Sequence, residues 1–199
     1  MTTMAPPKPY VATTYDLQNL DGISGPQLDL HYKLYQGYVA NTNTLSDNLR
    51  ELAVQGKIGT PVYNEQKRRL GFEFAGMRMH EFYFGAMTPN GGALDENTRL
   101  GKAIVEAYGS VRAWEDDFKA TGMMRGIGWA MLLQDPVTKR LQNFWITDHE
   151  NGHPPAFNPI VVMDVWEHAY MADYGTNRKD YIEAYFKNIC WKVTSNRLL

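Results

Sequence analysis

The sequence has 199 residues and a formal net charge of −2, with 44% hydrophobic and 13% aromatic residues. This apolar content excludes a disordered chain, and the length allows one sizeable core or two small domains that share an interface. The near-neutral charge gives no reason to expect nucleic acid or an anionic membrane as a partner. One cysteine, Cys190, excludes an internal disulfide framework and a thiolate-rich zinc site.

The same features favour a reducing compartment. Residues 1–9 lack the apolar core of a signal peptide, and no later run approaches the length of a membrane span. We therefore expect a cytoplasmic protein that begins with a short extended arm.

Two long helices are predicted for the first half of the chain. The first begins at Ser24, an N-cap residue, with Pro26 in its first turn. Its apolar stripe recurs at steps of three and four and comprises Leu28, His31, Tyr35, Tyr38, Thr42, Leu45, Leu49 and Leu52. After the break at residues 56–61, a second helix is predicted from about Asn64, with the stripe Leu70, Phe74, Met77, His80, Phe84 and Met87. Two long helices with a short link should pair antiparallel, which can bring His31 and His80 to the same depth.

The second half of the chain mixes helices and strands. Helices are predicted at residues 97–108, 110–120, 167–174 and 178–196, and strands at residues 129–134, 141–146 and 160–163. The turn at residues 135–139 joins the first two strands as a hairpin. These patterns predict an α+β protein with a helical hairpin first and a small sheet after it.

A carboxylate and an imidazole stand where the last predicted strand ends. Asp164 and His168 follow the apolar run at residues 160–163 and lie four residues apart, so they can converge on one ion. Such an N/O pair suits manganese, iron or zinc. An isolated pair at this spacing is more often an interface carboxylate and a hydrogen-bonded core histidine.

The five histidines are more informative together than singly. They are His31, His80, His149, His153 and His168. Neutral imidazoles buried in an apolar hairpin need partners for their ring nitrogens, and a shared ion supplies one for each. Three imidazoles and a carboxylate can hold a redox metal with a position left for solvent or substrate. A closed zinc site would also take four ligands, although structural zinc sites usually include cysteine.

Four separated motifs closely resemble those of the iron/manganese superoxide dismutases. They are DVWEHAY at residues 164–170, His31 followed by YVAN at 38–41, MHEFY at 79–83 with PNGG at 89–92, and GIGWA at 126–130. The resemblance runs from about Tyr10 to the C-terminus. It implies the family's fold, an N-terminal antiparallel helical hairpin followed by a three-stranded antiparallel sheet with flanking helices. It also implies domains at residues 1–92 and 93–199, with the metal site between them.

The resemblance further implies the activity and its residues. The enzyme would convert superoxide to O₂ and hydrogen peroxide, with one iron or manganese ion per subunit, as a homodimer or a tetramer. The metal ligands would be His31, His80, Asp164 and His168. Tyr38 matches the gateway tyrosine, Trp129 and Trp166 match aromatic walls of the pocket, and Glu167 matches the glutamate that contacts a ligand histidine of the other subunit.

The family also needs a side chain that hydrogen-bonds to the solvent molecule on the metal. Many members use a glutamine from the second helix or from the loop after the second strand. The helical position is Gly76 here, which cannot serve, and the loop position falls at His149. We assign the role to His149, with His153 as the alternative one register away.

Two departures concern the dimer interface. The family usually has a second histidine four residues after the first ligand, whereas this chain has Leu34-Tyr35 there. The spacing from the first ligand to the gateway tyrosine is also one residue shorter in this chain than is usual in the family. The tyrosine that would follow Tyr170 is Met171. Because the shorter spacing needs no π-bulge, we expect a regular first helix with Tyr35 near the space of the missing histidine and Met171 of a second subunit as its neighbour.

Two other classes of function fit these residues less well than superoxide dismutation. A non-enzymatic member of the fold would be expected to lose ligands, whereas all four are present. A mononuclear iron dioxygenase typically uses two histidines, one carboxylate and several open positions, and a third histidine leaves too few. Iron and manganese are not distinguished, because the ligands are the same for both.

Overall fold

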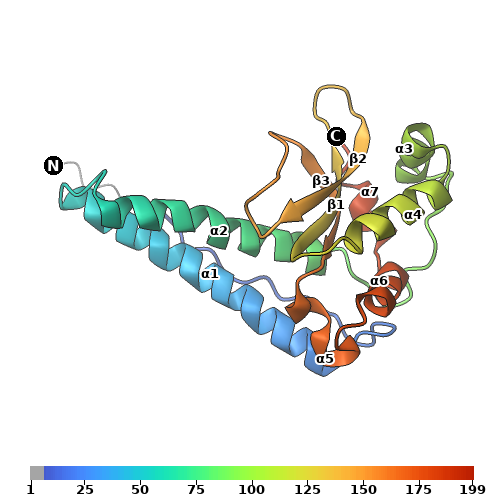
Figure 1. Cartoon of the computed structure of the whole chain (residues 1–199), viewed down its shortest axis with the longest axis horizontal. Coiled ribbons are helices and arrows are strands. Elements are labelled where there is room, and N and C mark those ends of the chain that lie inside the picture. Colours follow the sequence, from blue (N-terminus) through green and yellow to red (C-terminus); the bar gives the residue numbers. More distant parts are fainter. Residues whose placement is uncertain (1–6) are drawn as a thin grey trace.

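The computed structural model describes residues 7–199, so most of the predicted N-terminal arm at residues 1–9 lies outside the described part. The helices are α1 (Gly25–Val54), α2 (Pro61–Phe84), α3 (Arg99–Tyr108), α4 (Val111–Gly122), η1 (Glu167–Ala169, a 3-10 helix), α5 (Met171–Tyr174), α6 (Arg178–Lys187) and α7 (Trp191–Ser195). The strands are β1 (Gly128–Gln134), β2 (Leu141–Thr147) and β3 (Asn158–Asp164). The hairpin of α1 and α2 projects from a body that contains the sheet and the remaining helices (Figure 1).

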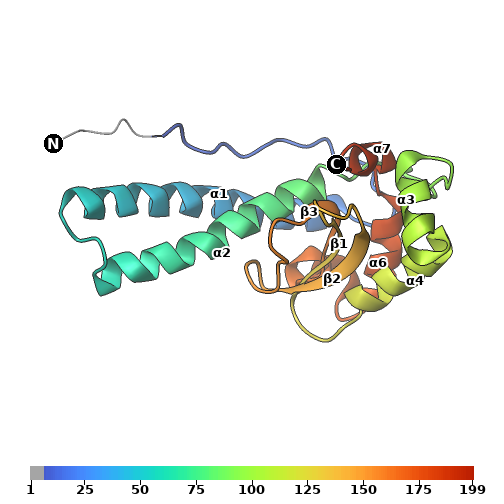
Figure 2. The same cartoon turned by 90° about the horizontal axis from the view of Figure 1, so that it is seen from above.

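Each hairpin helix has a side-chain N-cap and a proline in its first turn. The Ser24 side chain accepts a hydrogen bond from the Gln27 backbone N–H, and the Thr60 side chain accepts one from the Tyr63 N–H. The predicted start of the second helix at Asn64 is therefore three residues late, because Thr60-Pro61 is an N-cap followed by a proline at the first helical position. Residues 7–15 run alongside α1 (Figure 2), and the Tyr10 N–H donates to Asn43 Oδ1 at 2.9 Å.

The sheet has the strand order β2-β1-β3 and is antiparallel throughout. The central strand β1 is buried along its whole length. Its register places Trp129 opposite Asp164 of β3 and Ile146 of β2. This sheet after a helical hairpin confirms the predicted fold class. The division at residue 92 stays a prediction.

The C-terminal helices differ from the prediction. Residues 167–174 form η1 and α5, and the helix predicted at residues 178–196 is split into α6 and α7. The split occurs because Asn188 to Cys190 pair with residues 86–88: the Thr88 N–H donates to the Asn188 carbonyl, and the Cys190 N–H donates to the Ala86 carbonyl. This pairing between distant segments outweighs the local helical pattern.

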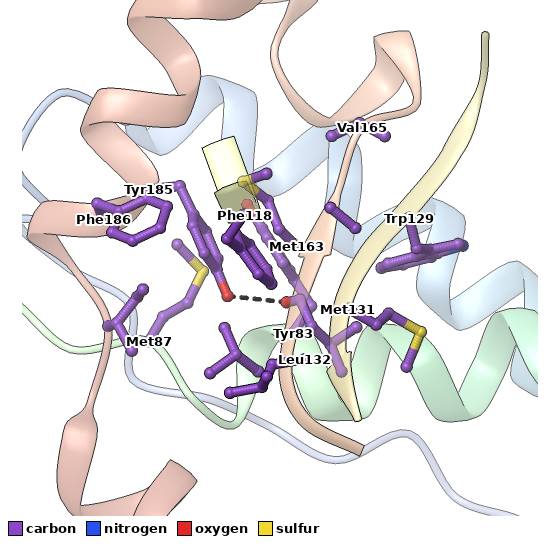
Figure 3. Packing of buried hydrophobic residues seen from close by; sticks show 14 of the residues in the cluster. Tyr83, Met87, Phe118, Trp129, Met131, Leu132, Met163, Val165, Tyr185 and Phe186 are labelled. Atoms are coloured by element: carbon purple, nitrogen blue, oxygen red, sulfur yellow. Dashed lines mark hydrogen bonds between the residues drawn. The ribbon is translucent and has the colours of Figure 1, made fainter. Parts of the chain in front are cut away.

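One apolar core lies between the sheet and the helices (Figure 3). Tyr83 of α2, Met131 of β1 and Met163 of β3 are fully buried in it. Tyr185 of α6 is also buried, and its hydroxyl donates to the Val162 carbonyl at 2.9 Å. The core therefore fixes the end of β3, where Asp164 stands. Within residues 7–199, no helix combines the length and the apolar character needed to cross a membrane.

Candidate metal centre

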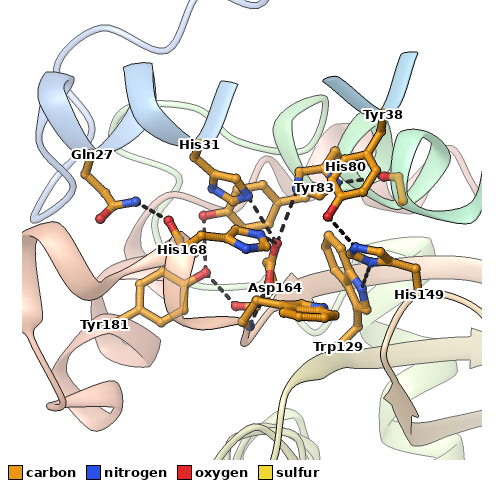
Figure 4. A network of polar contacts seen from close by, with 12 residues as sticks. Gln27, His31, Tyr38, His80, Tyr83, Trp129, His149, Asp164, His168 and Tyr181 are labelled. Atoms are coloured by element: carbon orange, nitrogen blue, oxygen red, sulfur yellow. Dashed lines mark hydrogen bonds and ion pairs between the residues drawn. The ribbon is translucent and has the colours of Figure 1, made fainter. Parts of the chain in front are cut away.

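Four side chains from four elements converge at the junction of the hairpin and the sheet (Figure 4). They are His31 of α1, His80 of α2, Asp164 at the end of β3 and His168 of η1. One donor atom from each lies within 4.8 Å of all the others. Asp164 Oδ2 lies 3.1 Å from His31 Nε2, 3.2 Å from His168 Nε2 and 3.6 Å from His80 Nε2. The structure thus brings together all four predicted ligands.

The tautomer of His80 leaves one ring nitrogen free to bind a metal ion. Its Nδ1 lies 2.7 Å from the Gly76 carbonyl, and because a carbonyl only accepts, Nδ1 carries the proton. Its Nε2 is therefore a lone-pair donor. That buried atom has no hydrogen-bond partner among residues 7–199. A buried nitrogen without a partner is costly, and a metal ion at the cluster would satisfy it.

The charges of the cluster fit a divalent or trivalent cation. Burial alone would raise the pKa of Asp164, but the charge of His168 and hydrogen bonds from His168 and His31 outweigh it and hold the pKa below its ordinary value. Burial lowers the pKa of His31 and lowers that of His80 well below the usual value, with His31 adding to the latter shift. The site therefore offers an ionised carboxylate at Asp164 and neutral imidazoles at His31 and His80, which are the forms that bind iron and manganese.

A second polar chain runs beside the cluster. The Trp129 Nε1–H donates to His149 Nδ1 at 3.1 Å, and His149 Nε2 lies 2.7 Å from the Tyr38 hydroxyl. Burial lowers the pKa of His149 to about 4, so this imidazole is neutral at pH 7. Because Nδ1 must accept from the indole, the single proton sits on Nε2 and is donated to the Tyr38 oxygen. The hydroxyl proton of Tyr38 is therefore directed to another acceptor.

Gly76 makes the position of Tyr38 possible. A Cβ atom at residue 76 would lie 2.7 Å from Tyr38 Cδ1, closer than real side chains approach. The Tyr38 ring lies beside His80 with centroids 5.1 Å apart, and Phe72 packs on His149 at 4.6 Å. The Tyr38 ring therefore occupies the space beside residue 76 that a side chain at this helical position would take.

The structure separates the two candidate histidines of the loop. His149 is buried and contacts Tyr38, whereas His153 is exposed and its Nε2 lies 3.0 Å from the carbonyl of His149.

Of the predicted aromatic walls, Trp129 packs edge-on against His80 with centroids 5.1 Å apart. Trp166 stacks between His149 at 4.9 Å and His168 at 5.7 Å.

Glu167 is not one of the four clustered side chains. It is exposed and lines a surface hollow together with three half-exposed methionines, Met123, Met124 and Met171. Its contact with another subunit stays a prediction.

Tyr35 behaves as its helical spacing predicted. Helix α1 is regular α-helix from end to end, and the Tyr35 ring is fully buried, stacked near His80 with centroids 6.3 Å apart. Its hydroxyl accepts from the Thr13 N–H at 2.8 Å and donates to Glu81 Oε1 at 3.1 Å. Tyr35 therefore connects the N-terminal arm to α2 and has no hydrogen bond to Tyr38. A neighbouring Met171 from a second subunit stays a prediction.

Three residues around the centre were missed by the sequence analysis. Tyr181 donates to the Asp164 carbonyl at 2.8 Å, Phe72 covers His149, and Gln27 donates to the His168 carbonyl at 2.6 Å. Gln27 stands four residues before His31, so its place on the ligand-bearing face of α1 was available as a signal. The other two depend on contacts between distant segments.

This fold and donor set define a class, a mononuclear metalloprotein in which the helical hairpin contributes two ligands and the end of β3 and η1 contribute one each. The family model for the C-terminal domain of iron/manganese superoxide dismutases matches residues 96–197. The chain is 37% identical over 185 residues to the superoxide dismutase [Fe] of Aquifex pyrophilus, covering 90% of this chain and 86% of that protein. It is 34% identical over 187 residues to the superoxide dismutase [Mn] of Haloarcula marismortui, covering 94% and 88%.

A third relative, the superoxide dismutase [Mn/Fe] of Propionibacterium freudenreichii subsp. shermanii, is 33% identical over 181 residues, which are 89% of each chain. The chain belongs to the iron/manganese superoxide dismutase family. This membership confirms the predicted family, the predicted oxidoreductase class and the predicted use of an iron or manganese ion. The relatives carry either metal name or both, so they leave the choice between the two metals undecided.

Proposed function

We propose that this chain dismutates superoxide, with His31, His80, Asp164 and His168 as metal ligands and with Tyr38 and His149 as the proton-donating pair. The observation that carries the proposal is that the two groups meet at His80. Its Nε2, which has no hydrogen-bond partner within residues 7–199, belongs to the ligand cluster, and the Tyr38 ring lies against the same imidazole. An iron or manganese ion bound there supplies the one-electron couple that the reaction needs.

The reaction consumes two superoxide ions and two protons and yields O₂ and hydrogen peroxide, so the residues must supply protons. Burial and the charges of Asp164 and Glu73 raise the pKa of Tyr38, so its hydroxyl is protonated at neutral pH. His149 donates its Nε2 proton to the tyrosine oxygen and leaves the hydroxyl proton for the reacting oxygen species. Trp129 fixes the tautomer of His149 that makes this direction possible.

The surrounding side chains shield His31, His80 and Asp164 from bulk water. His31 and His80 are almost fully buried, and the rings of Trp129 and Trp166 cover neighbouring imidazoles. In such surroundings hydrogen bonds and charges act more strongly than in water, which suits residues that must tune a metal potential.

The proposal includes a homodimer, with a tetramer as the alternative. Its support is the exposed Glu167 next to ligand His168 and the half-exposed methionines of the same hollow. Exposed apolar side chains, methionine among them, are enriched at interfaces between subunits, and charged residues lie at the rim. A cytoplasmic location stays a prediction that rests on the single cysteine.

The competing function is a non-enzymatic metal-binding or structural member of the fold. Purified protein reconstituted separately with iron and with manganese, followed by metal analysis and a superoxide dismutase assay, distinguishes the two. We expect one ion per chain and activity with one or both metals. Stoichiometric metal without dismutation would favour the non-enzymatic alternative, and no stoichiometric metal would refute the site.

A further inference from the structure

We infer that Gln27 is a positioning residue for ligand His168. The Gln27 side chain is 1% exposed and lies between α1 and the segment that carries this ligand. Its Nε2 donates to the His168 carbonyl at 2.6 Å, and its Oε1 accepts from the Ala172 N–H at 3.0 Å. The first of these bonds is drawn in Figure 4. One buried amide thus holds the backbone at His168 and four residues beyond it.

The amide of Gln27 has one allowed orientation. The His168 carbonyl can only accept and the Ala172 N–H can only donate, so a flipped amide would lose both hydrogen bonds. Both halves of the side chain are therefore used. A shorter or apolar residue at position 27 would leave a backbone donor and a backbone acceptor without partners in a largely buried place.

His168 needs such support more than the other ligands do. His31 and His80 stand within helices of 30 and 24 residues, and Asp164 ends a strand paired with the buried β1. His168 belongs to a 3-10 helix of three residues, which has little internal hydrogen bonding of its own. Its side chain is 19% exposed, against at most 1% for the other three. Its position therefore depends on contacts from outside its own segment.

The contact with Gln27 couples two ligands through one helix. Gln27 and His31 are four residues apart in α1 and lie on the same face. The His31 and His168 rings lie 5.0 Å apart, and both reach Asp164 Oδ2. Helix α1 therefore supplies one ligand directly and sets the distance to a second through the glutamine. Ser24 adds a more exposed contact in the same direction, with its N–H donating to Asp173 Oδ2 at 2.7 Å.

Loss of the glutamine contact should loosen metal binding without removing a ligand. Contacts that orient metal ligands typically change metal affinity by about 10- to 100-fold when they are removed. The inference rests on the proposed function only in requiring that the four side chains bind a metal. It requires neither dismutation nor a particular choice between iron and manganese.

The test compares Gln27→Met, which keeps the side-chain length and removes both hydrogen bonds, with Gln36→Met on an exposed position of the same helix. Each protein is loaded with manganese, and its release into excess EDTA is timed. The thermal midpoint is measured with and without the metal. We expect Gln27→Met to release manganese about 10- to 100-fold faster than wild type and to gain less thermal stability from the metal. Gln36→Met should match wild type in both.

A purely structural role would lower the midpoints of both forms equally and leave the release rate unchanged, and that result would overturn the inference. If Gln27→Met fails to fold, Gln27→Glu decides the matter, because it keeps the acceptor for Ala172 and loses the donor to His168. We expect faster release from it as well, and release at the wild-type rate would refute the role. Wild-type protein that binds manganese without dismutating superoxide would contradict the proposed function and leave this comparison intact.

Discussion

The hairpin supplies two ligands and the stretch from the end of β3 to η1 supplies the other two, but the two regions hold their ligands by different means. His31 and His80 are fixed by the regular geometry of two long helices packed on each other. Asp164 and His168 are fixed by contacts with distant residues, among them Tyr181 and Gln27. The difference teaches that periodicity can locate ligands on regular helices, whereas a ligand on an irregular turn depends on side chains elsewhere in the chain.

The largest effects are expected from removing a ligand of either region. His80→Ala or Asp164→Ala should abolish metal binding and activity together, because each removes one of the four donors that meet within 4.8 Å. Metal analysis of the purified variants checks this. His153→Ala is the control, since that side chain is exposed, and it should leave activity nearly unchanged. Wild-type metal content in either ligand variant would show the assignment to be wrong.

The next largest effect should come from Gly76→Ala in the hairpin. A Cβ atom there meets Tyr38 Cδ1 at 2.7 Å, so the tyrosine must move away from His149. We expect activity to fall by about 10-fold or more while metal content is kept, because only the proton-donating pair is disturbed.

Gly37→Ala on the exposed face of α1 is the matched control, because a Cβ atom there meets nothing within 4 Å. It should raise stability by up to about 1 kcal/mol and leave activity unchanged. Equal behaviour of the two alanine variants in both assays would mean that Gly76 does not set the position of Tyr38.

The pH dependence of stability should report on His149. Burial lowers its folded-state pKa to about 4 from an ordinary value of 6.5, so the unfolded chain binds the extra proton first. This imidazole therefore contributes no penalty above pH 6.5, and stability is lost as the pH falls from 6.5 toward 4. Between those values one proton corresponds to a slope of about 1.4 kcal/mol per pH unit.

Urea unfolding of the metal-free protein checks this slope. The free energy of unfolding of His149→Gln should fall less steeply with decreasing pH than that of wild type. The two slopes should differ by at most about 1.4 kcal/mol per pH unit, the slope for one proton. Parallel curves for the two proteins would show that the imidazole is not held neutral by the fold.

A smaller effect is expected from Glu167→Ala in the C-terminal region. If the exposed carboxylate contacts a ligand histidine of a second subunit, its loss should weaken dimerisation and shorten metal retention together. Sedimentation at micromolar concentration and metal release measure the two. Glu106→Ala, an exposed glutamate of α3, is the control. A fully active monomer in the wild type would rule this interface out.

Much of the fold and of the ligand set could be predicted from the sequence, and the exceptions have physical causes. The stripes of α1 and α2 carry His31 and His80, and the β3 pattern ends at Asp164. The split between α6 and α7 was missed because it depends on Asn188 to Cys190 pairing with residues 86–88, which no local pattern reveals. The support of His168 by Gln27 likewise joins residues 141 positions apart.

The central claim is that one ion is held by two hairpin ligands and two C-terminal ligands. Anomalous diffraction from crystals of the manganese- or iron-loaded protein, collected at the absorption edge of the metal, tests it most directly. The account predicts one peak per chain, bonded to His31, His80, Asp164 and His168, with Tyr38 and His149 beside it and not bonded to it. A peak coordinated by His149 or His153, or one that lacks any of the four ligands, would contradict it.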